Sequence, residues 1–155
     1  MRQRIDCPQG SLGMDQELLD LLKLHLDTLA KIHRITGIVT LPSRTWQARN
    51  DVAAFLAMHL QVPIFDLLFW KEPPKKRQGE LLNNNQRHEN VHQHMQVNTR
   101  IRVPQGTLIL LDDYIGSGNT LKEAARALRS QSILNELVPF TIATVKWRLG
   151  KQGFV

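Results

Sequence analysis

The chain has 155 residues, of which 42% are hydrophobic and 22% are charged. That length and composition match one ordinary globular domain, so we do not expect a disordered chain. The single cysteine excludes an internal disulfide and a cysteine-rich zinc site. The sequence contains no apolar run of the roughly 18 residues that a membrane helix needs, and no secretory signal opens it. We therefore expect residues 1–155 to form a single cytoplasmic domain without membrane association.

Lysine and arginine together number 20, against 14 aspartates and glutamates, which gives a formal net charge of +6. The excess is uneven, because residues 71–102 alone contain seven basic and three acidic side chains, a surplus of +4. A basic surplus of this size favours anionic partners such as phosphates, nucleotides or nucleic acids.

Helical and strand-like patterns alternate along most of the chain. Apolar side chains recur at helical spacing between residues 14 and 35, so we expect residues 1–36 to form a helical cover. The other expected elements, in chain order, are a strand over 37–42, a helix over 46–60, a strand over 62–69, a strand over 106–112, a helix over 119–130 and a strand over 137–145. This order is typical of right-handed βαβ units. The predicted fold class is α/β, a Rossmann-like parallel sheet flanked by helices.

Residues 71–95 differ from the rest of the chain in composition. They contain paired prolines, a run of asparagines and a high density of charge, which is typical of a functional loop in a compact domain. We expect a flexible basic loop here. Its cluster of Lys75, Lys76 and Arg77 fits either a solvated charge run or a group that neutralises an anion. The nearby histidines, including His88 and His92, match no zinc motif and favour a surface role.

The strongest functional motif is the run LILLDDYIGSGNT over residues 108–120. Its apolar first half predicts a buried strand that delivers two carboxylates, Asp112 and Asp113, to its carboxyl end. Ligands bind beyond the carboxyl ends of the strands in open parallel sheets. Neighbouring carboxylates at that position suit a ligand that offers hydroxyl groups.

The second half of the motif predicts a phosphate-binding turn. Gly116 and Gly118 permit positive φ and close backbone approach, and Ser117 and Thr120 add hydroxyl donors. Backbone amides of such a turn and of the following helix form an anion cradle. The alternative is that the acids only cap the helix and the glycines only turn the chain. The order of strand, acids, glycines and hydroxyls favours a sugar phosphate ligand instead.

This motif resembles the phosphoribosyl-pyrophosphate (PRPP) motif of type I phosphoribosyltransferases, where a hydrophobic strand leads to two acids and a Ser/Thr-Gly-x-Thr loop. The resemblance implies that Asp112 and Asp113 are catalytic residues that hold the ribose 2′- and 3′-hydroxyls. It also implies a set of residues around the 5′-phosphate of PRPP: Tyr114, Ile115, Gly116, Ser117, Gly118, Asn119 and Thr120. Gly116 departs from the threonine that is frequent in the family, which should loosen the loop.

A weaker resemblance extends over residues 37–145. The end of the expected first strand is similar to the family's pyrophosphate loop, which implies that Ser43 and Arg44, with Lys75, Lys76 and Arg77, contact pyrophosphate. PRPP is handled as a Mg²⁺ complex in which substrate oxygens and water hold the metal, so no direct protein ligand is implied. Residues 78–97, with the run from Gln86 to Val91 within them, resemble ComF-like competence proteins and the phosphoribosyltransferase-like domains of some RecQ-type helicases.

Two functions remain open from the sequence. The first is a phosphoribosyltransferase that joins PRPP to a nitrogen nucleophile. The second is a non-catalytic module that binds a nucleotide, DNA or RNA and works with DNA-processing proteins in DNA metabolism, competence or bacterial defence. Ten residues follow Val145, so we expect a small or absent hood over the base, which favours the second function. The resemblance also implies a homodimer as a candidate assembly.

Overall fold

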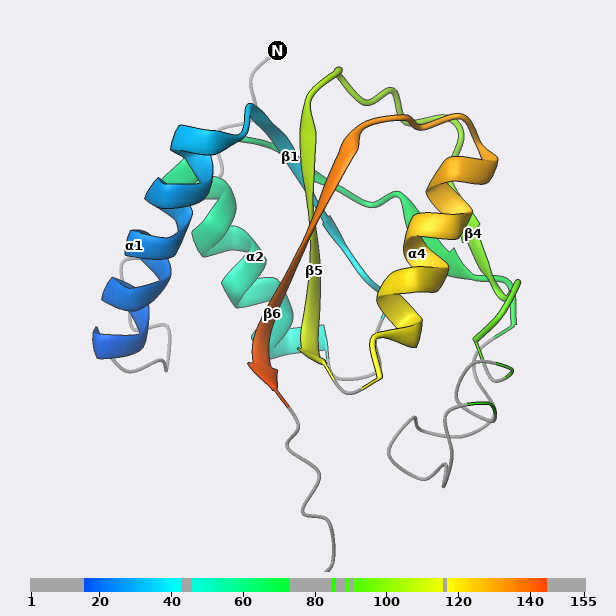
Figure 1. The fold of residues 1–155 in the computed structure, drawn as a ribbon, viewed down its shortest axis with the longest axis horizontal. Helices are drawn as coiled ribbons and strands as arrows, with labels where there is room; N and C mark the ends of the chain where they lie inside the picture. The colour runs from blue at the N-terminus through cyan, green and yellow to red at the C-terminus, as the bar shows by residue number, and fades with distance from the viewer. Residues whose placement is uncertain are drawn as a thin grey trace, which may run out of the picture.

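The computed structural model describes residues 16–42, 46–72, 85, 89, 91–115 and 117–144. Within these residues the chain forms both helices and strands (Figure 1). The elements are α1 (Gln16–Ile32), β1 (Ile35–Thr40), α2 (Trp46–Leu60), β2 (Ile64–Phe65), β3 (Leu68–Trp70), β4 (Met95–Val97), β5 (Thr107–Ile115), α4 (Asn119–Ser130) and β6 (Glu136–Thr144). No helix in this part of the chain is long and apolar enough to cross a membrane.

Four of the strands form one parallel sheet in the order β2-β1-β5-β6. β5 is a central strand, and its apolar residues from Leu108 to Leu111 are all buried. Continuous apolar runs of this kind are expected where helices cover both faces of a parallel sheet. The structure therefore confirms the α/β fold class predicted from the sequence.

Alternate side chains of the strands supply a separate core on each face of the sheet. On one face, Ile109 and Leu111 pack with side chains of α1 and α2. On the other face, Leu108 and Leu110 pack with side chains of α4, β3 and β4. Figure 1 shows this layering, with α1 and α2 on one side of the sheet and α4 with β4 on the other. The connection from β5 to α4 lies at the carboxyl edge of the sheet.

The prediction of one strand over residues 62–69 is wrong. β2 pairs in parallel with β1, whereas β3 leaves the main sheet and pairs antiparallel with β4. Leu67 and Leu68, around the start of β3, are buried in the core on the α4 side. In β2, by contrast, Ile64 is exposed and Phe65 is only partly buried. The run is apolar throughout, and an apolar pattern cannot show where a chain changes its pairing partner.

Other boundaries shift by a few residues. β1 begins and ends two residues before the predicted strand over 37–42, whereas α2 and α4 have the predicted bounds. β5 continues three residues past Asp112 because β6 continues to pair with it as far as Ile115. The predicted basic loop over 71–95 falls mostly outside the described residues, and so do residues 1–15.

Candidate functional site

The described part of the connection between β5 and α4 contains a glycine in the left-handed conformation. Gly118 is the N-cap of α4, with φ 72° and ψ 6°, and as a glycine it has no side chain with which to cap the helix. The amide of Lys122 donates to the Gly118 carbonyl at 3.0 Å as the first bond of the helix. The amides before it point out of the helix, at the positive end of its dipole. The positive φ predicted for a glycine of this loop is thus found at Gly118.

Asp112 is the first residue of β5 beyond its pairing with β1. Thr40 is the last β1 residue in register with β5, opposite Leu111, and the Leu41 amide donates to the Leu111 carbonyl at 2.9 Å. Asp112 is partly buried and lies opposite Thr141 of β6. A carboxylate is therefore presented where β1 has ended but β6 still continues, at the carboxyl edge of the sheet.

The remaining predicted residues of the motif divide into two groups. Ser117 and Thr120 are partly buried in the turn and the first helical residues, and Asn119 is almost fully buried. The backbone of Asp113, Tyr114 and Ile115 continues β5, as its pairing with β6 shows. The other predicted site residues lie outside the described residues: Ser43, Arg44, Lys75, Lys76, Arg77 and Gly116.

Arg49 is a buried cation at the same edge that the sequence did not single out. It lies in the first turns of α2 with 6% of its surface exposed. Its Nη1 donates to the Leu41 carbonyl and its Nη2 to Asn50 Oδ1 at 3.4 Å, while Nε is buried without a hydrogen-bond partner. No carboxylate of the described residues forms an ion pair with it. An arginine inside a helix gives no sequence signal that distinguishes this arrangement from an ordinary surface side chain.

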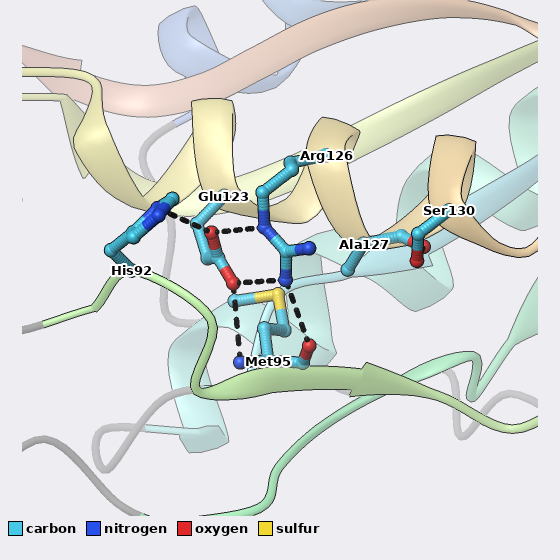
Figure 2. A network of polar contacts seen from close by, with 6 residues as sticks. All are labelled: His92, Met95, Glu123, Arg126, Ala127 and Ser130. Carbon is cyan, nitrogen blue, oxygen red and sulfur yellow. Dashed lines mark hydrogen bonds and ion pairs between the residues drawn. The ribbon is translucent and has the colours of Figure 1, made fainter.

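A second buried charge, Glu123 of α4, was also missed. Only 3% of its side chain is exposed, and Arg126 donates to its two carboxylate oxygens through Nε and Nη2, both at 2.7 Å (Figure 2). The Met95 amide of β4 donates to Oε1 at 3.4 Å, and His92 Nδ1 lies 3.8 Å from Oε2. In sequence, Glu123 and Arg126 resemble a solvent-exposed helical ion pair.

The environment of Glu123 keeps this carboxylate charged. Burial raises its pKa, but hydrogen bonds from Arg126 and from the backbone of Gln93 and Met95 outweigh that effect, so the pKa is lowered overall. The guanidinium of Arg126 has a raised pKa because of the same hydrogen bonds to Glu123. The pair is therefore ionised at neutral pH and links α4 to β4.

Metal binding by protein side chains has no support in the described part of the chain. No group of three or more histidine, cysteine, aspartate or glutamate side chains there is arranged to hold a metal ion. His92 instead lies beside Glu123, and His88 is outside the described residues.

Comparisons with known proteins identify the fold. No protein-family model matches the chain, and no curated protein matches it in sequence. An adenine phosphoribosyltransferase structure matches with a TM-score of 0.57 and 20% identity, covering 88% of this chain and 72% of the other. The Saccharomyces cerevisiae enzyme, solved with an imino-altritol bisphosphate and adenine, matches with a TM-score of 0.56 and 20% identity over 87% and 70%.

A third match is the Trypanosoma brucei adenine phosphoribosyltransferase in complex with AMP, pyrophosphate and ribose-5-phosphate. Its TM-score is 0.51 and its identity 17%, over 84% of this chain and 52% of that one. The chain described here therefore has the α/β fold of these phosphoribosyltransferases, with the parallel four-stranded sheet between helical layers.

Proposed function

We propose that this protein binds PRPP, or the 5′-phosphate of a nucleotide, at the turn between β5 and α4. The observation that carries the proposal is the left-handed Gly118 at the N-terminus of α4, shortly after the strand that bears Asp112. A phosphate suits the amides and the helix dipole, and the ribose hydroxyls suit the carboxylates. The fold shared with the phosphoribosyltransferases supports the same ligand class.

The proposed reaction is the transfer of phosphoribose to a nitrogen nucleophile. The bond from C1′ to pyrophosphate breaks, its electron pair leaves with pyrophosphate, and the lone pair of the nitrogen forms the new C1′–N bond with loss of a proton. Negative charge grows on the leaving group, and preorganised cations stabilise it. Arg49 supplies a buried cation near the end of β1. We expect Arg44 and the Lys75–Arg77 cluster to supply others, with Mg²⁺ carried by PRPP itself.

Calorimetry with PRPP and Mg²⁺ tests the ligand site. The wild-type chain should bind, and Asp112→Asn combined with Asp113→Asn should abolish binding. Glu136→Gln is the matched control, because Glu136 is a carboxylate at the first residue of β6, at the opposite edge of the sheet. Undetectable wild-type binding at millimolar PRPP would contradict the proposal.

A screen for PRPP-dependent pyrophosphate release across nucleobases and other nitrogen nucleophiles tests catalysis separately. Release that depends on one acceptor, and that the double aspartate variant lacks, would identify a transferase. PRPP binding without release from any acceptor would leave a ligand-binding module and exclude turnover with those acceptors.

The surplus of +4 over residues 71–102 favours a second candidate, a non-catalytic module for nucleotides or nucleic acids related to ComF-like proteins. Such a module should bind DNA or RNA with an affinity that falls steeply as salt increases, because counterions are released from phosphates. A gel-shift series at rising salt concentration measures this. Binding that is absent at low salt for single and double strands would exclude this candidate.

A further inference from the structure

One cross-strand pair in the small β3–β4 sheet is hydrogen-bonded both to the chain after β1 and to α4. Trp70 of β3 lies opposite Met95 of β4 in the antiparallel register. The Lys71 amide donates to the His94 carbonyl at 2.8 Å, which extends this pairing by one residue. Met95 is fully buried and belongs to the core that α4 covers.

The Trp70 side of the pair is bonded to the end of β1. The Trp70 indole donates through Nε1 to the Pro42 carbonyl at 3.1 Å. Pro42 follows Leu41, whose carbonyl accepts from the buried guanidinium of Arg49. Trp70 therefore fixes the chain exit from β1 next to the cation that has no carboxylate partner among the described residues.

The Met95 side of the pair is bonded to α4. The Met95 amide donates to Glu123 Oε1, and Arg126 Nη2 donates to the Met95 carbonyl at 3.5 Å (Figure 2). Arg126 also donates to Glu123 Oε1 through Nη2 and to Oε2 through Nε. Glu123 lies one turn after Asn119, where α4 begins at the phosphate-binding turn. Glu123 therefore fixes the start of α4 relative to β4.

Together these bonds form one bridge from the end of β1 to the start of α4. We propose that Trp70 and Glu123 are positioning residues that set the distance between the Arg49 cation and the phosphate-binding turn. This rests on the proposed function, and it predicts that breaking the bridge weakens the binding of a ligand with phosphate groups on both sides of the ribose more than that of a ligand with one. A ligand with one phosphate contacts only one of the two groups that the bridge connects. Its affinity therefore does not depend on the distance between them.

The magnitude of such an effect follows from general experience with preorganised sites. Small displacements of positioned groups cost large factors in function, and coupling between two sites typically amounts to 5- to 150-fold in affinity. The bridge consists of two hydrogen-bonded contacts, each from a buried or partly buried side chain. We expect the change in affinity on breaking it to fall within that range.

The test compares PRPP with ribose 5-phosphate, both measured by calorimetry in the presence of Mg²⁺. Trp70→Phe keeps the ring and removes the indole N–H, and Glu123→Gln keeps the shape and removes the charge. Each variant should weaken PRPP binding roughly tenfold and ribose 5-phosphate binding less than about threefold. The combined variant should lose less than the product of the two single effects, because either break opens the same bridge.

The outcomes separate the two proposals. If the wild type binds neither ligand, the proposed function fails. If the wild type binds both and the variants weaken both ligands equally, or neither, the bridge does not select for two phosphates and the inference is overturned. Glu136→Gln should change neither affinity. Circular dichroism checks folding, and Arg126→Lys replaces Glu123→Gln if the latter unfolds, since it removes the bidentate geometry but keeps the charge.

Discussion

Gly106 and Gly118 lie at opposite ends of β5, and both have positive φ, 145° and 72°. Gly106 precedes the strand at the amino edge of the sheet, where an added Cβ would lie 2.3 Å from Thr36 Cγ2 and 2.8 Å from the Arg34 carbonyl oxygen. Gly118 follows the strand at the carboxyl edge, where the chain turns into α4. Gly106 therefore permits close packing at the amino end of β5, and Gly118 permits the turn of the proposed site at its carboxyl end.

Gly118→Ala should lower the free energy of unfolding by roughly 1 kcal/mol, because a left-handed conformation is unfavourable for residues with a Cβ. It should also weaken ribose 5-phosphate binding, since the turn would relax away from the left-handed conformation on which the proposed site depends. Gly118→Asn should do both to a smaller extent, because asparagine tolerates this conformation better than alanine. Urea unfolding and calorimetry measure the two effects.

Gly106→Ala serves as the matched control for that experiment. It should destabilise the fold by about 1–3 kcal/mol through backbone strain and the contact with Thr36. At temperatures where the variant is folded, its ribose 5-phosphate affinity should equal that of the wild type. Equal losses of affinity in Gly106→Ala and Gly118→Ala would show that ligand binding depends on the general stability of the fold and not on the conformation of the turn.

Arg49→Met is expected to separate binding from stability. The substitution removes a buried cation that has no carboxylate partner among the described residues, but it also removes the donor to the Leu41 carbonyl. Removing the buried charge should stabilise the fold, and losing the hydrogen bond to the Leu41 carbonyl should destabilise it. The free energy of unfolding should therefore change by less than about 1 kcal/mol. Pyrophosphate and PRPP affinity should fall about tenfold, as for loss of one charge-assisted contact. An unchanged PRPP affinity would remove Arg49 from the proposed site.

The Glu123–Arg126 pair also makes a prediction about stability. Arg126→Met leaves the buried carboxylate with its backbone donors and with His92 at 3.8 Å, and it should cost about 2 kcal/mol, the order of a hydrogen bond to a charged group. Adding Glu123→Gln should recover part of that loss because the unpaired charge disappears. Arg129→Met, which removes an exposed bond to the Ile133 carbonyl, should cost less than about 1 kcal/mol. Urea unfolding measures the stability of these variants. A double variant that is less stable than Arg126→Met would contradict the prediction.

The sequence predicted the elements that local patterns encode. The apolar run before Asp112 has the signature of a buried parallel strand, and the amphipathic pattern after Gly118 that of a helix, so β5 and α4 were found with little error. The left-handed turn between them was also predictable, since few residues other than glycine adopt it.

The elements that were missed depend on contacts between distant residues. β3 and β4 have three residues each and are stable only because they pair across a gap of more than twenty residues. Strand propensity of such short segments carries little information without the pairing partner. The same holds for Arg49 and Glu123, whose burial results from the packing of α2 on the end of β1 and of α4 on β4. A polar residue inside a helix does not indicate from sequence that it is buried.

The stability of the fold should depend on pH through Glu136, a carboxylate at the amino edge of the sheet. The Thr107 hydroxyl donates to Glu136 Oε2 at 2.7 Å and His33 Nδ1 lies 2.9 Å from the same oxygen, and these contacts lower the pKa of Glu136 below its ordinary value of 4.5. A carboxyl group with a depressed pKa in the folded state stabilises the fold above its unfolded-state pKa, and this contribution disappears as the pH falls through the folded-state pKa. Glu136→Gln should therefore be less stable than the wild type at pH 6, and the two unfolding curves should converge as the pH falls below about 4. Thermal unfolding between pH 3 and pH 7 measures the difference, and a gap that stays constant across this range would show that these contacts do not depend on the charge of Glu136.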